Sequence, residues 1–71
     1  MLHSRAALQR CQSWAKHSGK TREAMAEEAG VNLAVIRRLR AGLSVSIASL
    51  ERVEATIPRN WRDPLPDRQL A

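Results

Sequence analysis

Three glycines and one proline divide this sequence into four short segments. Gly19, Gly30 and Gly42 are the only glycines of the chain, and Pro58 follows the fourth segment. Glycine adopts the left-handed conformation that ends a helix at little cost, whereas proline cannot continue a helix. Because these stops exclude one long helix, the pattern predicts a bundle of short helices.

A capping residue stands where each segment begins. Ser4, Thr21, Asn32 and Ser46 can each accept a hydrogen bond from a free backbone N–H group in the first turn of a helix. The caps and stops together predict helices over residues 4–17, 21–30, 32–40 and 46–57. The tail from Pro58 onward should be irregular, with one short turn around Asn60 and Trp61.

Each predicted helix has apolar residues at helical spacing, so one face of each should be buried. The second helix carries small alanines, which would let another helix approach closely. The expected buried positions are Leu8, Cys11, Trp14 and Ala15; Met25; Val35, Ile36 and Leu39; and Ile47, Leu50, Val53 and Ile57. The fold class is therefore all-α, with one compact domain at residues 1–57 and a tail at 58–71.

A chain of 71 residues can bury only a thin core, and its single cysteine, Cys11, cannot form an internal disulfide. Its scattered His3 and His17 do not match zinc-ligand spacing, so we expect no metal and no cofactor. Neither a signal peptide nor a membrane span is evident, and a lone cysteine suits a reducing compartment. These features predict a cytoplasmic protein that has no membrane partner.

The charge of the chain is uneven. Twelve basic and seven acidic residues give a formal net charge of +5, which favours a polyanionic partner. Between Val31 and Leu43 the sequence has three arginines and no acid: Arg37, Arg38 and Arg40.

The middle of the chain has the layout of a helix-turn-helix. One helix ends at Gly30, a three-residue turn follows, and an arginine-rich helix starts at Asn32. A merely solvated arginine face is the alternative.

Residues 19–42 resemble the helix-turn-helix of the phage repressor and Cro family, also called lambda-repressor-like or XRE-type. The residues that carry the resemblance are Gly19, Thr21, Met25-Ala26, Gly30-Val31, Ile36, Leu39 and Gly42. The likeness covers about residues 6–57. It implies a compact four- to five-helix lambda-repressor-like domain, with the motif at 21–40 and a recognition helix at 32–40 that enters the major groove of DNA.

The resemblance also implies which residues touch DNA. Expected base contacts are Leu33, Ala34, Arg37 and Arg38. Expected phosphate contacts are Thr21, Arg22, Asn32, Arg40, Ser44 and Ser46. Arg40 could instead help to cap the end of its helix. Three departures from the family pattern matter: Arg22 replaces a common glutamine, Arg40 replaces a common glutamate, and Leu33-Ala34 replace polar residues. Leu33 could belong to the core instead of contacting a base.

These features lead us to expect a sequence-specific transcriptional regulator of double-stranded DNA, similar to Cro-like repressors of phages or mobile elements. It would bind a palindromic operator as a homodimer, need no small-molecule ligand and lie with the nucleoid of a bacterial or phage-infected cell. Ile57, Trp61 and Leu65 are the expected dimer contacts, although Trp61 could instead cover the protein's own core.

Other function classes fit the sequence less well. An antitoxin or an accessory protein-interaction module could use the same fold. A cationic membrane-active helix is disfavoured because the glycines interrupt any continuous amphipathic face. We expect no enzyme, since the sequence shows no paired carboxylates, no nucleophile–base pair and no glycine-rich phosphate loop. Cys11 most simply fills the core.

Overall fold

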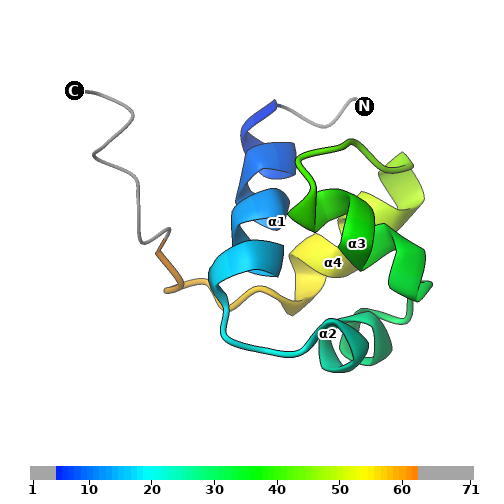
Figure 1. Ribbon diagram of the computed structural model, residues 1–71. Coiled ribbons are helices and arrows are strands. Elements are labelled where there is room, and N and C mark those ends of the chain that lie inside the picture. The colour runs from blue at the N-terminus through cyan, green and yellow to red at the C-terminus, as the bar shows by residue number, and fades with distance from the viewer. Residues whose placement is uncertain (1–4, 63–71) are drawn as a thin grey trace.

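The computed structural model describes residues 5–62, and within that range the protein is four helices without a strand (Figure 1). The helices are α1 (Arg5–His17), α2 (Arg22–Ala29), α3 (Leu33–Arg40) and α4 (Ile47–Thr56). Both α1 and α2 pack against α3 and against α4. The predicted all-α class is therefore confirmed. The predicted cap Ser4 lies outside the described residues.

Side-chain caps fix where three of the helices begin. The hydroxyl of Thr21 accepts a hydrogen bond from the Ala24 N–H at 3.0 Å, and Asn32 Oδ1 accepts one from Ala34 at 2.9 Å. Ser46 caps α4 in the same way, through the Ser49 N–H at 3.2 Å. Each bond satisfies a backbone donor that has no partner inside its helix, which confirms the capping predictions.

The turn between α2 and α3 depends on one left-handed residue. Gly30 has a φ of 69°, which residues with a Cβ rarely adopt. In this conformation the Val31 N–H donates to the Ala26 carbonyl at 3.0 Å, which closes the end of α2. The chain then needs only Val31 and Asn32 before α3 starts.

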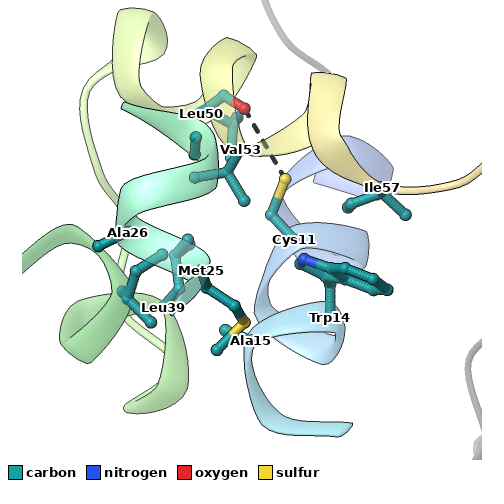
Figure 2. Close-up of a cluster of buried hydrophobic side chains, with 11 residues drawn as sticks. Cys11, Trp14, Ala15, Met25, Ala26, Leu39, Leu50, Val53 and Ile57 are labelled. Atoms are coloured by element: carbon teal, nitrogen blue, oxygen red, sulfur yellow. Dashed lines mark hydrogen bonds between the residues drawn. The ribbon is translucent and has the colours of Figure 1, made fainter. Parts of the chain in front are cut away.

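The core is one cluster with contributions from all four helices (Figure 2). Ile36 and Leu39 of α3 are fully buried, and so is Cys11 of α1. The buried side chains are Cys11, Trp14, Ala15, Met25, Ala26, Ala29, Ile36, Leu39, Leu50, Val53 and Ile57. Leu8 and Val35 pack on the edge of this cluster. Nearly every predicted core position is thus confirmed.

Ile47 is the exception, and its predicted burial was wrong. Its side chain is 47% exposed, although Leu50 and Val53 of the same stripe are buried. At about 100° per residue, Ile47 lies roughly 60° from Leu50 on the side away from Val53. It therefore sits at the border of the buried face, in the first turn of α4.

Two isoleucine-to-alanine variants should separate core from surface. We expect Ile36→Ala to lower the free energy of unfolding by about 2–5 kcal/mol, because it leaves a cavity in a thin core. Ile47→Ala is the matched control and should change it by less than about 0.5 kcal/mol. Urea titration followed by far-UV circular dichroism measures both. Equal losses in the two variants would contradict the core assignment.

Candidate nucleic-acid interface

The candidate interface is built around α3, whose two faces differ sharply. Ile36 and Leu39 point into the core, while Ala34, Arg37 and Arg38 are exposed. Helical periodicity puts these three exposed residues together on the side opposite the core. Three of the four predicted base contacts therefore share one face. The fourth, Leu33, is half-buried and packs against the core cluster, so it stands at the edge of that face.

The two exposed arginines differ in what holds them. Within residues 5–62, the side chain of Arg37 has no hydrogen bond or ion pair to another residue. The Arg38 Nε donates to the Ser44 carbonyl at 3.1 Å, which ties the loop after α3 to the helix. This single bond leaves both terminal amino groups of Arg38 for another acceptor. Neither guanidinium forms an ion pair with an acid of the described chain.

The stretch of sequence that contains this face has no acids. The segment from Gly30 to Leu50 contains no aspartate or glutamate. Of the acids on α2, Glu28 pairs with Lys20 at 3.0 Å. A face with two arginines that make no ion pair favours an outward positive potential, which attracts polyanions such as the phosphates of a nucleic acid.

The residues predicted to contact phosphate are spread around the turn and the loop. Thr21 and Asn32 are exposed, and each uses a side-chain oxygen to cap a helix. Ser46 does the same, and Ser44 is exposed in the loop before it. Arg22 is exposed in the first turn of α2, and its side chain makes no hydrogen bond or ion pair within residues 5–62.

Arg40 is placed differently from what the sequence suggested. Its side chain is half-buried, its Nε donates to the Ala15 carbonyl at 2.8 Å, and its Nη2 donates to the Lys20 carbonyl at 3.1 Å. The guanidinium therefore joins the end of α3 to the end of α1 and to the loop that follows. Helical spacing alone could not reveal this, because the acceptors are backbone atoms 20 and 25 residues away.

Sequence reasoning also missed a hydrogen bond to the turn between α2 and α3. Arg52 of α4 donates from Nη1 to the Gly30 carbonyl at 3.4 Å. This long bond places a cation at the end of α2, where the helix dipole favours positive charge. In the sequence Arg52 reads as an ordinary solvated residue on the polar face of a helix.

The predicted dimer contacts have little free surface in this structure. Ile57 belongs to the core, with 8% of its surface exposed. The Trp61 ring meets Trp14 edge-on at a centroid distance of 5.3 Å, and the Arg10 guanidinium lies 5.5 Å from its centre. Trp61 thus covers the protein's own core, which is one of the two roles that the sequence left open. Leu65 lies outside the described residues.

The rest of the described chain holds little other chemistry. Within residues 5–62, no three His, Cys, Asp or Glu side chains lie close enough to hold a metal ion. None of the helices described is long and apolar enough to cross a membrane. Burial raises the pKa of the Cys11 thiol to about 12, with a smaller contribution from the charge of Glu54.

We expect Cys11 to react with a thiol reagent such as DTNB at least roughly a hundredfold more slowly in the folded protein than in urea. The thiolate is the reactive species, and the raised pKa keeps the thiol protonated at neutral pH. Absorbance at pH 8 follows the reaction, and the urea-unfolded protein is the control. Equal rates in the two states would show that Cys11 is accessible and would contradict its burial.

Comparison with known proteins adds nothing to these observations: the chain matches no family model, no curated protein and no solved structure. The interpretation of the candidate interface therefore depends on its geometry and charge. The relevant features are a short α2, a turn at Gly30 and an α3 with one buried and one basic face.

Proposed function

We propose that this protein binds double-stranded DNA selectively by placing the exposed face of α3 in the major groove. The observation that carries the proposal is the exposed face of Ala34, Arg37 and Arg38, on a helix that follows α2 after a short turn and contains no acid. An α-helix fits the major groove, and bidentate arginine–guanine pairs are the commonest specific contacts there. We assign base readout to Arg37 and Arg38.

The residues around α3 have a supporting role in this proposal. Three exposed polar side chains can contact phosphates on either side of the groove. They are Arg22 at the start of α2, and Ser44 and Ser46 between α3 and α4. Such contacts position a protein on the duplex without reading its sequence. The side chain of Ala34, which cannot donate a hydrogen bond, would pack against a thymine methyl group.

We further propose that two copies bind a site with dyad symmetry and that the protein regulates transcription. A single eight-residue helix covers only a few base pairs, so a second copy about 34 Å away would raise both affinity and selectivity. Because residues 19–42 resemble the phage repressor and Cro family, we propose that the protein regulates transcription by occupying a promoter.

In vitro selection from a randomised duplex library tests the proposal. We expect enrichment of a sequence with two inverted half-sites spaced about ten base pairs from centre to centre. Sedimentation of the complex on the selected duplex should give two protein chains per duplex. If several rounds enrich no sequence, or if affinity for the enriched pool equals that for random DNA, selective binding is refuted.

Arg38→Ala should reduce affinity for the selected duplex by about 1–3 kcal/mol and relax selectivity at one or two base pairs. Arg38 also bonds the Ser44 carbonyl, so the melting temperature of the variant must be measured alongside. Fluorescence anisotropy with the selected duplex and with single-base variants gives the affinities. Equal loss on specific and random DNA would show that Arg38 does not read bases.

Arg22→Gln should instead weaken all duplexes by a similar factor. Losing one phosphate contact should lower the slope of log affinity against log salt concentration by about one unit. Titrations over a range of salt concentrations, on both selected and random duplexes, provide the slopes. An unchanged slope would remove Arg22 from the DNA interface.

A second function, as a protein-interaction module, is favoured by one observation. Leu43 and Ile47 are the two large apolar side chains exposed in the described chain, each at 47%. Apolar side chains at a surface are typical of sites that bind other proteins, although two residues make only a small patch. A double variant, Arg37→Ala with Arg38→Ala, separates the two functions. A DNA-binding regulator should lose its affinity for DNA while it stays folded, whereas a protein-interaction module should keep its function.

A further inference from the structure

We infer that Arg40 is a positioning residue that sets the orientation of α3 for DNA and does not itself contact phosphate; this inference rests on the proposed function. The guanidinium leaves the last residue of α3 and turns back toward the body of the protein. Its Nε and Nη2 donate to two carbonyls from two different parts of the chain, Ala15 and Lys20. One rigid planar group thus fixes three segments relative to one another.

The acceptors explain why a cation is used at this place. Ala15 lies in the last turn of α1, where carbonyl oxygens have no N–H partner within the helix. The same helix end carries the negative pole of the helix dipole, so a positive charge is favoured there. Lys20 follows in the loop that leads to α2. Arg40 therefore caps the last turn of α1 and at the same time holds the loop that leads into α2.

The orientation of α3 needs such a restraint. The helix has only eight residues, and the side chains that bury it deepest, Ile36 and Leu39, are both apolar. Apolar contacts are not directional, so they resist tilting and sliding of a short helix less than hydrogen bonds do. Selective base contacts require the side chains that make them to be placed to within about 0.5 Å and 10–20°. The two hydrogen bonds of the Arg40 guanidinium supply a directional restraint of this kind on α3.

Arg40 differs from the other two arginines of α3 in its exposure and its hydrogen bonds. Arg37 and Arg38 are exposed, whereas Arg40 is half-buried and already holds two charge-assisted hydrogen bonds. Reaching for a phosphate would break those bonds and leave the Ala15 carbonyl without a partner. The cost of an unpaired buried acceptor makes that exchange unfavourable.

Two variants at Arg40 and one control distinguish positioning of α3 from direct contact with a phosphate. Arg40→Lys keeps the charge, but its single ammonium group cannot reproduce a planar fork across two carbonyls. Arg40→Gln removes the charge as well. Arg22→Gln is the matched control, since it removes the same charge from an exposed side chain. The probes are the duplex selected with the wild-type protein and a random-sequence duplex, each titrated at several salt concentrations.

Positioning predicts that both Arg40 variants lose roughly tenfold in the ratio of specific to random affinity, about the effect of one lost base contact. It also predicts a salt slope like that of the wild type, while Arg22→Gln lowers the slope and keeps the ratio. In the free protein, amide hydrogen exchange should become faster in α3 than in α4 for both Arg40 variants. Melting temperatures establish that each variant is folded under the conditions of the titrations.

Two results would overturn the inference. If Arg40→Lys binds like the wild type while Arg40→Gln lowers the salt slope by about 0.9, Arg40 is a phosphate contact. If neither variant changes the ratio or the exchange in α3, Arg40 has no positioning role. Failure of the proposed function looks different, because the wild-type protein itself would then prefer no duplex. In that case hydrogen exchange alone decides whether Arg40 holds α3.

Discussion

The packing of α3 against α1 is the contact on which the rest of this small fold depends. Ile36 and Leu39 are fully buried in the same core cluster as Cys11 and Ala15 of α1, and α1 packs against α3. This packing decides which side of α3 faces outward, so it produces both the core and the basic face. A rotation of α3 by half a turn would exchange the two faces.

Hydrogen bonds from arginine side chains to backbone carbonyls reinforce this thin core. Arg10 donates to Pro58, Arg38 to Ser44, Arg40 to Ala15 and Lys20, and Arg52 to Gly30. Most of these acceptors lie in loops or at helix ends, where carbonyls lack partners. Part of the positive charge of the chain therefore joins segments of the fold, beside the role in DNA binding that we propose for Arg37 and Arg38. Net charge alone overstates how many arginines are available to a partner.

The segment after α4 takes part in the fold as well. Pro58 accepts hydrogen bonds from Arg10 and from the Trp61 N–H, at 3.1 and 3.0 Å. These bonds bring Trp61 over Trp14, where the edge-on ring contact extends the core beyond the four helices. Arg10 lies against the same ring, so α1 and residues 58–61 hold each other. This part of the segment after α4 therefore packs with the four helices.

Local patterns were enough to predict the four helices of the described chain, the caps of three of them and most of the core. Gly30, Asn32 and Ser46 act within a few residues of themselves, so their effects can be read from neighbouring positions. The periodic apolar stripes likewise predicted Ile36 and Leu39. The exposed Arg37 and Arg38 followed from the same geometry. Their role in binding DNA stays a prediction.

Contacts between distant segments decided the remainder. The exposure of Ile47 depends on which side of α4 the other helices cover, and the partners of Arg40 depend on where α1 ends in space. The choice between core and dimer contact for Trp61 required Trp14, 47 positions earlier, to be in place. Helix periodicity states which residues share a face, but it carries no information about the backbone atoms of another segment that a long side chain can reach.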